Sequence, residues 1–202
     1  MRFAVVILAG GLATRMGGGD KPLLRAGGRS LLAHLLDRLG GAGGPLAINA
    51  RGDAARFAAF GLPVLPDGPV GTGPLAGVLA AMDWAAGLGC DAVLTVPGDT
   101  PFVPRDLPAA LAPAPAVAVS AGRRHHLVAL WPVAARDALR ARLAALPPDG
   151  PRAAFGVRAF AVTIGMRDVD FSARPFDPFH NVNTPADLAE ADRLAPRDAA
   201  RG

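Results

Sequence analysis

The sequence predicts a three-layer α/β fold built around a mainly parallel sheet. Phe3–Leu8 is a continuous apolar run rich in β-branched residues, which is typical of a strand buried on both faces. Further short apolar runs alternate with segments of helical spacing along the chain. Polar residues gather directly after the apolar runs, at the strand ends where such folds bind their ligands. The pattern therefore indicates a single ligand site along one edge of the sheet.

The expected strands follow from apolar runs bounded by glycine, proline and polar residues. In chain order they are Phe3–Leu8, Leu46–Asn49, Pro63–Leu65, Asp91–Val96, Ala116–Ser120, Leu127–Trp131 and Ala161–Met166.

The expected helices are recognised by their ends. Ser30, Asp53 and Thr184 are good N-cap residues, and Pro74 and Pro185 suit a first helical position. Asp187 completes a capping-box-like pattern with Thr184. The predicted helical segments are residues 31–39, 54–60, 74–87, 106–111, 133–146, 152–158 and 185–195.

Composition limits the classes of protein that the chain can form. Its 202 residues suit one domain, expected at residues 1–195 and followed by a disordered tail at 196–202. Apolar residues make up 51%, but no run reaches the roughly 18 residues of a membrane span. The single cysteine, Cys90, suits a reducing cytoplasm. The net charge is only +4, without a basic stripe, so neither a nucleic acid nor a membrane is the expected partner.

A long glycine-rich loop follows the first strand. It begins Ala9-Gly10-Gly11 and continues through Arg15 to Lys21, so it combines close backbone approach with positive charge, as binding a nucleoside triphosphate requires. A P-loop is excluded because Asp20 precedes the lysine and proline follows it. The dinucleotide fingerprint fails because the first two glycines are adjacent. A secretory signal peptide is disfavoured because glycines interrupt the apolar segment and no cleavage pattern follows.

The biased composition makes its exceptions informative. Lys21 is the only lysine in the chain, and Asn49, Asn181 and Asn183 are its only asparagines. Lysine is a compact point charge that an arginine fork does not replace in a tight site. Asparagine supplies both a donor and an acceptor. These four positions are therefore candidate functional residues.

Asp99 directly follows the expected strand Asp91–Val96, between prolines and a glycine that restrict the backbone. A carboxylate held there suits Mg²⁺, which uses few protein ligands and shares its coordination with phosphates and water. An ordinary Asx-turn is the alternative. With the cationic loop, Asp99 predicts a Mg²⁺-nucleoside triphosphate site. No Ser-His-Asp or Cys-His nucleophile is apparent, and nucleotidyl transfer to an ionised phosphate needs none.

At this point the motifs, taken in order, resemble a known family. They are L-A-G-G-x-x-x-R-M-G-G, D-K, P-L-A-G at Pro74–Gly77, G-D-T-P at Gly98–Pro101 and N-V-N-T-P at Asn181–Pro185. This combination, spanning nearly the whole chain, is similar to the molybdenum cofactor guanylyltransferases. The resemblance implies a Rossmann-like fold similar to that of the nucleotide-diphospho-sugar transferases. It also implies transfer of GMP from GTP to the terminal phosphate of molybdopterin, with release of pyrophosphate.

The resemblance also implies roles for particular residues. The implied nucleotide contacts are Leu8, Ala9, Gly10, Gly11, Lys21, Asn49, Asp67 and Asp99. Arg15, Lys21 and Asp99 are the expected catalytic residues, with Arg15 facing the phosphates and Asp99 binding Mg²⁺. Asn181 and Asn183 are expected on the molybdopterin side. Cofactor-insertase and molybdoenzyme apoproteins are further expected partners. The family often has His-Pro before the strand at residue 127, whereas here Leu127 follows His126, which leaves His125 and His126 without an assigned role.

Other activities stay open at this point. The nearer alternative is a CTP-dependent molybdopterin cytidylyltransferase or a sugar-1-phosphate nucleotidyltransferase. The cytidylyl relatives tend to carry L-A-A-G where this chain has L-A-G-G, which favours GTP. The more distant alternative is a carrier that binds guanine nucleotide or cofactor without turnover, although a carrier would not need both the lysine and the metal carboxylate.

Overall fold

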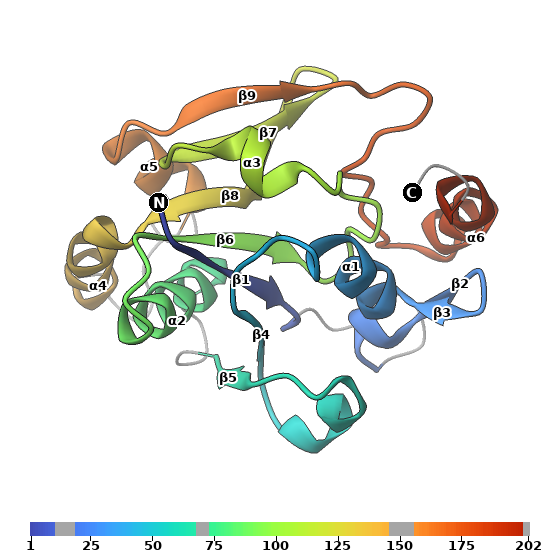
Figure 1. Cartoon of the computed structure of the whole chain (residues 1–202), viewed down its shortest axis with the longest axis horizontal. Coiled ribbons are helices and arrows are strands. Elements are labelled where there is room, and N and C mark those ends of the chain that lie inside the picture. Colours follow the sequence, from blue (N-terminus) through green and yellow to red (C-terminus); the bar gives the residue numbers. More distant parts are fainter. Residues whose placement is uncertain (11–18, 68–72, 146–155, 200–202) are drawn as a thin grey trace.

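The computed structural model describes residues 1–10, 19–67, 73–145 and 156–199 (Figure 1). Its main sheet has seven strands in the order β5-β4-β1-β6-β8-β7-β9. The bounds of these strands are β1 Phe3–Leu8, β4 Leu46–Ala50, β5 Val64–Pro66, β6 Ala92–Pro97, β7 Ala116–Ser120, β8 Arg123–Pro132 and β9 Arg167–Phe171. Within the described sheet β8 alone runs antiparallel to its neighbours. The carboxyl ends of the other six strands therefore share one edge with the start of β8.

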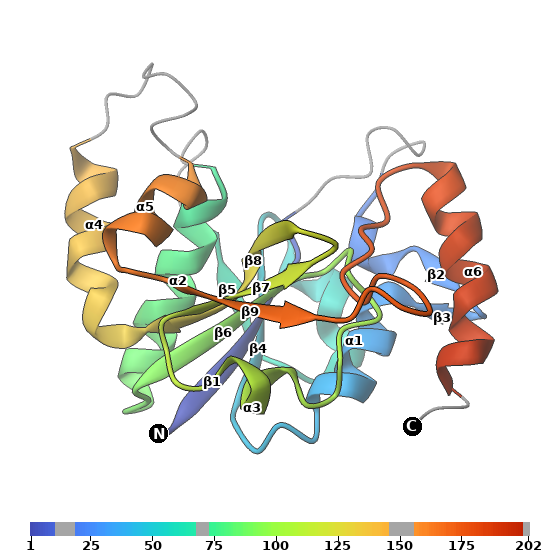
Figure 2. The same ribbon diagram turned by 90° about the horizontal axis from the view of Figure 1, so that it is seen from above.

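Helices cover both faces of this sheet, as Figure 2 shows from above. The helices are α1 Leu31–Leu39, α2 Pro74–Gly87, α3 Leu107–Leu111, α4 Arg136–Ala144, α5 Val157–Thr163 and α6 Pro185–Ala199. Short 3-10 helices lie at Lys21–Leu23, Ala54–Phe60 and Val133–Ala135. A small hairpin, β2 Arg25–Ala26 with β3 Arg29–Ser30, packs beside α6.

The alternation of side chains along the strands creates two cores. In β1, Val5 and Ile7 face a cluster that contains residues of α1 and α3, whereas Ala4 and Val6 face a cluster that contains residues of α2, α4 and α5. All four side chains are fully buried. Burial on both faces explains why this strand is a continuous apolar run. The predicted three-layer α/β/α fold with a mainly parallel sheet is thus confirmed.

The helix caps lie where the sequence predicts them. The Ser30 hydroxyl accepts a hydrogen bond from the Ala33 backbone N–H at 3.1 Å and begins α1. At the start of α6 the Asp187 carboxylate accepts hydrogen bonds from the backbone N–H groups of Asn183 (2.9 Å) and Thr184 (2.8 Å). The Asp187 N–H in turn donates to the Thr184 hydroxyl at 3.2 Å. This reciprocal capping fixes the direction in which the chain leaves the Asn181–Asn183 segment.

Two of the predicted elements differ in the structure. The strand predicted at Ala161–Met166 is wrong: helix α5 runs to Thr163, and the last strand, β9, begins only at Arg167. Val157, Phe160 and Ala161 are buried at helical spacing, which an apolar run alone did not reveal. β9 was missed because it is an edge strand with only partly buried apolar residues, unlike the fully buried β6. The strand predicted at Leu127–Trp131 is longer, because β8 already begins at Arg123.

The C-terminal helix packs on the hairpin rather than on the sheet. Ala191, Leu194 and Ala195 form a third cluster with Ala26 and other residues at the carboxyl end of the sheet. The helix continues to Ala199, although the sequence predicts a tail from residue 196. Within the described residues no helix has the length and apolar character that crossing a bilayer demands.

Candidate active site

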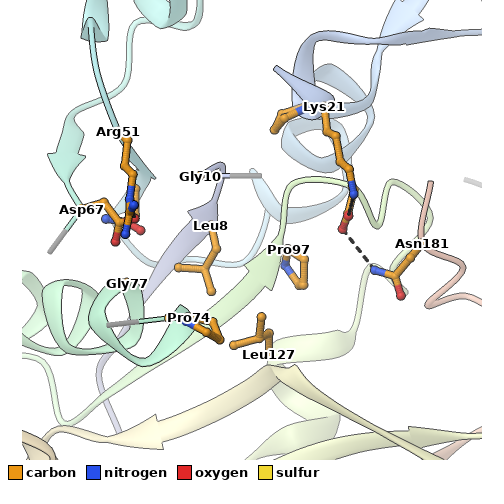
Figure 3. Close-up of a pocket in the computed structure, with 14 residues that line it drawn as sticks. Leu8, Gly10, Lys21, Arg51, Asp67, Pro74, Gly77, Pro97, Leu127 and Asn181 are labelled. Carbon is orange, nitrogen blue, oxygen red and sulfur yellow. Dashed lines mark hydrogen bonds and ion pairs between the residues drawn. The ribbon is translucent and has the colours of Figure 1, made fainter. Parts of the chain in front are cut away.

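A pocket of about 380 Å³ opens at the carboxyl ends of β1, β4 and β6 (Figure 3). Its two ends are polar and its middle is apolar. Arg51 and Asp67 lie at one end, and Lys21 and Asn181 lie at the other. Between them the pocket is lined by Leu8, Pro74, Pro97 and Leu127. This pocket lies at the strand ends, where the sequence predicts the ligand site.

Asp99 is the centre of one polar end. Its Oδ2 lies 3.4 Å from the Lys21 Nζ, and its Oδ1 accepts a hydrogen bond from the Asn181 amide at 3.1 Å. The Lys21 ammonium also donates to the Asn183 Oδ1 at 2.5 Å. The side chains of Lys21 and Asp99 are each 18% exposed, so the pair faces the pocket without being sealed from it. We call Lys21, Asp99, Asn181 and Asn183 the lysine cluster.

Backbone contacts hold the lysine cluster together. Gly98 must be a glycine, because a Cβ there would lie 2.6 Å from the Pro22 side chain. The turn that carries Lys21 can therefore approach the end of β6 closely enough for the lysine to reach Asp99. From the other side, the Val182 N–H donates to the Asp99 carbonyl at 2.9 Å. Both asparagines that flank Val182 are thereby placed beside the carboxylate.

Asn49 defines the opposite end of the pocket. It lies near the end of β4 and is only 2% exposed. Its amide donates to the backbone carbonyls of Leu65 (3.3 Å) and Pro66 (3.2 Å), which orients the amide and ties β4 to β5. A Cβ at Gly77 of α2 would lie 2.6 Å from the Asn49 Oδ1. The glycine of the P-L-A-G motif thus allows helix α2 to pass directly over this amide oxygen.

Arg51 and Asp67 complete this end of the pocket. We call Asn49, Arg51 and Asp67 the asparagine end. The Arg51 Nε donates to the Asp67 Oδ2 at 2.6 Å. Asp67 lies beside Gly10, where a Cβ would come within 3.4 Å of its carboxylate. Sequence reasoning missed Arg51. It follows Asn49 by two positions at a strand exit, so the alternation of side chains was a signal that could have found it.

The remaining predicted residues divide into three groups. Leu8 and Gly10 line the pocket. Ala9 is fully buried in the core and contributes a backbone N–H that donates to the Asn49 carbonyl at 2.7 Å. Gly11 and Arg15 lie outside the described residues.

A second pocket, of about 470 Å³, adjoins the first and shares Pro97, Leu127 and Asn181 with it. Its basic lining consists of Arg123, Arg124, His125, His126 and Arg158. Among the described residues that line it there is no carboxylate. Burial lowers the pKa of His126, and the neighbouring Arg124 and Arg158 lower it further. Arg124 pairs with Asp168 at 2.7 Å, so the positive charge that this pocket offers comes from Arg123 and Arg158, which sequence reasoning did not assign to the site.

The donor set suits a hard divalent cation that brings its own ligands. In the described part of the chain, no group of three His, Cys, Asp or Glu side chains could form a protein-only metal cage. Asp99 alone offers the first pocket a carboxylate beside its lysine, since Asp67 pairs with Arg51 at the other end. Mg²⁺ bound to a nucleotide uses one or two carboxylates plus phosphate and water oxygens. Asp99 therefore fits such an ion.

Comparison with known proteins identifies the family to which this chain is similar. Residues 5–159 match the family model described as the MobA-like NTP transferase domain. A molybdenum cofactor guanylyltransferase of Acidiphilium cryptum is 57% identical over 93% of this chain and 94% of its own. One of Rhodopseudomonas palustris (strain BisB5) is 50% identical over 96% of this chain and 94% of its own. In fold, the chain is similar to the crystal structure of molybdopterin-guanine dinucleotide biosynthesis protein A from Archaeoglobus fulgidus. The TM-score is 0.72 at 19% identity, over 96% of this chain and 99% of that one.

The mainly parallel sheet carries a lysine and a carboxylate at its carboxyl edge, and the match to the MobA-like NTP transferase domain places the chain in the class of nucleotidyltransferases. The sequence is 50% or more identical, along nearly its full length, to two molybdenum cofactor guanylyltransferases, which narrows the class to one family. The chain belongs to the molybdenum cofactor guanylyltransferase family.

Proposed function

We propose that this chain transfers GMP from GTP to the terminal phosphate of molybdopterin, forming molybdopterin guanine dinucleotide and releasing pyrophosphate. The observation that carries the proposal is the lysine cluster, in which a cation, a carboxylate and two amides meet at one end of a nucleotide-sized pocket. The names of the similar proteins support the choice of substrates.

The two ends of the pocket suggest the orientation of the nucleotide. Phosphates belong beside Lys21, because its ammonium supplies a compact positive charge. The guanine belongs at the asparagine end, because its N1 and N2 groups are donors and need acceptors such as the Asn49 Oδ1 or nearby carbonyls. The apolar stretch formed by Leu8, Pro97 and Leu127 lies between the two ends and suits the faces of the ribose and base.

The reaction proceeds by direct displacement. An oxygen of the acceptor phosphate attacks the α-phosphorus of GTP, a P–O bond forms, the bond to the bridging oxygen breaks, and pyrophosphate takes the electron pair. The attacking phosphate is already ionised, so no protein base is required. Lys21 neutralises charge on the phosphates, and Asn181 supports the Asp99 carboxylate. We assign Arg15 to the phosphates as well, on its place in the glycine-rich loop.

Asp99 is the residue that would hold Mg²⁺. A divalent cation supplies charge neutralisation at the α-phosphate and the departing pyrophosphate in such transfers. Lys21, which contacts Asp99, would add its positive charge to that of the cation near the phosphates. Asn183 holds the lysine through its own amide oxygen, so Lys21 keeps a partner when Asp99 binds the metal.

We place the acceptor in the second pocket. That pocket meets the first at Pro97, Leu127 and Asn181, so an acceptor bound there can present its terminal phosphate next to Asp99. Molybdopterin carries a phosphate, and Arg123 and Arg158 of the lining suit an anion, whereas Arg124 already pairs with Asp168. Asn181 lines both pockets, so it would lie beside the molybdopterin phosphate, on the side where the sequence resemblance places it.

The decisive test measures pyrophosphate release from GTP or CTP, with Mg²⁺ and with or without molybdopterin. We expect release with GTP only when molybdopterin is present. Preference for CTP would make the chain a cytidylyltransferase, and GTP binding without release would make it a carrier.

We further propose that a single domain serves both substrates in the cytoplasm and that the product passes to a cofactor insertase or a molybdoenzyme apoprotein.

A further inference from the structure

Two buried polar side chains and one half-buried carboxylate form a network beside the second pocket, which His125 also lines. The Ser120 hydroxyl donates to the Asp177 Oδ1 at 2.7 Å, and the same oxygen of Ser120 lies 2.7 Å from the His125 Nε2. Ser120 is 1% exposed and His125 is 7% exposed. The three residues come from the end of β7, the start of β8 and the connection between β9 and α6. We call them the serine relay.

The protons of the serine relay can be assigned. A hydroxyl has one proton, and the ionised Asp177 carboxylate can only accept, so the serine proton lies toward Asp177. His125 must then donate its Nε2–H to the Ser120 oxygen. In a nucleophilic triad the histidine would instead lie between serine and carboxylate and accept the serine proton. The serine relay is therefore not a nucleophile, and its order of contacts indicates a structural purpose.

Asp177 connects the serine relay to the active site. Its Oδ1 also accepts from the Phe179 N–H at 2.9 Å, and its carbonyl accepts from the His180 N–H at 3.1 Å. The Phe179 ring packs on the His125 ring, with centroids 4.8 Å apart. The next residues of the same turn are Asn181 and Val182, which bind Asp99 through a side chain and a backbone N–H. Figure 1 shows this connection passing from β9 toward α6 along the carboxyl edge of the sheet.

We propose that Ser120 and His125 are positioning residues that hold the Asp177–Asn183 turn, and thereby place Asn181 against Asp99. This inference rests on the proposed function, because it assigns the turn to the reaction between the two substrates. The turn has two anchors, the serine relay at its start and the lysine cluster at its end. Nucleotide contacts at the asparagine end come from other strands and do not depend on it.

The first measurement is hydrogen exchange of the peptide covering residues 177–183, which needs no substrate. Ser120→Ala removes both relay contacts, and loss of a hydrogen bond to a charged group should speed exchange there by about tenfold or more. Exchange in β1 and α2 should stay at the parent rate. Ser172→Ala is the matched control: it removes a hydroxyl from the same connection, but that hydroxyl contacts only the adjacent Arg174 backbone among the described atoms. Unchanged exchange in Ser120→Ala would overturn the proposal whatever the activity.

The second measurement separates positioning from general destabilisation. In Ser120→Ala and His125→Leu, equilibrium binding of GTP should match the parent, while kcat with molybdopterin falls about tenfold because Asn181 no longer supports Asp99. His125→Gln places an amide N–H near the position of Nε2 and should restore most of kcat. Equal loss in His125→Gln and His125→Leu, or loss of GTP binding in parallel with kcat, would refute positioning. If the parent itself releases no pyrophosphate, the proposed function fails, and the exchange result still decides whether the serine relay holds the turn.

Discussion

The two polar ends of the first pocket are assembled in different ways. At the asparagine end the interacting residues lie close in sequence: Asn49 contacts the carbonyls of residues 16 and 17 positions away, and Arg51 pairs with a residue 16 positions away. In the lysine cluster the separations are 78 residues for Lys21 to Asp99 and 162 residues for Lys21 to Asn183. One end is a product of two adjacent parallel strands, and the other requires the whole fold.

This difference predicts different responses to mutation. The asparagine end is part of the β4–β5 pairing, so a change there affects binding and stability together. The lysine cluster lies where loops meet after the strands, so its side chains can be changed with little loss of packing. We therefore expect catalysis to depend on the lysine cluster, and affinity for GTP to depend on the asparagine end.

The largest effect is expected for Asp99→Asn. The variant keeps the shape of the side chain but removes the charge that would hold Mg²⁺ and pair with Lys21. Loss of a preorganised electrostatic contact should lower kcat by about 100- to 1,000-fold. Pyrophosphate release across a Mg²⁺ series measures it, and a thermal melt should match that of the parent.

Asp106→Asn is the matched control for that experiment. Asp106 is exposed near the start of α3, and its side chain makes no capping hydrogen bond. The Asp106→Asn substitution removes one negative charge, as Asp99→Asn does, and should leave kcat unchanged. Normal turnover in Asp99→Asn at the same Mg²⁺ concentration would exclude Asp99 from the mechanism.

Substitution of Lys21 tests whether the lysine cluster needs a point charge. Lys21→Arg keeps the charge, but a guanidinium is too broad for the space between Asp99 and Asn183. Loss of a charge-assisted hydrogen bond corresponds to about 10- to 150-fold in kcat. Lys21→Ala should be worse still. Steady-state kinetics with GTP would contradict this account if the arginine variant kept parent activity.

Gly77→Ala probes the asparagine end without removing a polar group. Its Cβ would lie 2.6 Å from the Asn49 Oδ1, so either α2 or the amide must move. Overpacking of this kind costs about 1–3 kcal/mol, and we expect GTP affinity to weaken by about fivefold or more. Gly87→Ala in the same helix is the control, because a Cβ there meets no atom within 4 Å. Equal GTP affinities of the two variants in calorimetric titrations would contradict the assignment of the asparagine end to GTP binding.

The smallest effect is expected for Asp187→Asn, which weakens the cap of α6. Burial alone would raise the pKa of Asp187, but hydrogen bonds from Asn183 and Thr184 outweigh it and lower the pKa below its ordinary value of 3.8. A lowered carboxyl pKa stabilises the fold above about pH 4, and this contribution is lost as the pH falls through the folded-state pKa. Loss of the cap should cost about 1 kcal/mol at pH 7.

Thermal melts at pH 7 and pH 3 test the cap. The difference between Asp187→Asn and the parent should shrink at the lower pH, because the stabilisation that comes from the lowered pKa of Asp187 begins to be lost once the pH falls below the ordinary value of 3.8. Glu190→Gln in the same helix removes a 40% exposed carboxylate that pairs only with Arg193 among the described residues, and its melting temperature should differ from that of the parent by less at either pH. A difference in melting temperature between Asp187→Asn and the parent that was larger at pH 3 than at pH 7 would contradict a lowered pKa of Asp187.

Local sequence determined much of this molecule. The buried strands, the Ser30 and Asp187 caps and the helix from Pro74 follow from short-range chemistry, because each depends on residues within a few positions. The position of Lys21, Asn49 and Asp99 at strand ends could be predicted for the same reason. The helix at Val157–Thr163 could not, since its apolar run fits a strand equally well until its burial is known.

Only the tertiary structure decided which of these residues meet. Nothing local in the sequence links Lys21 to Asn183, or Ser120 to Asp177, because those contacts join separate elements across the sheet edge. The same applies to Gly98, whose missing Cβ matters only because Pro22 packs against it. The chain's own patterns thus specify the elements and the residue types of the site. The distances that bring a lysine, a carboxylate and two amides together arise only when the strands align in the sheet.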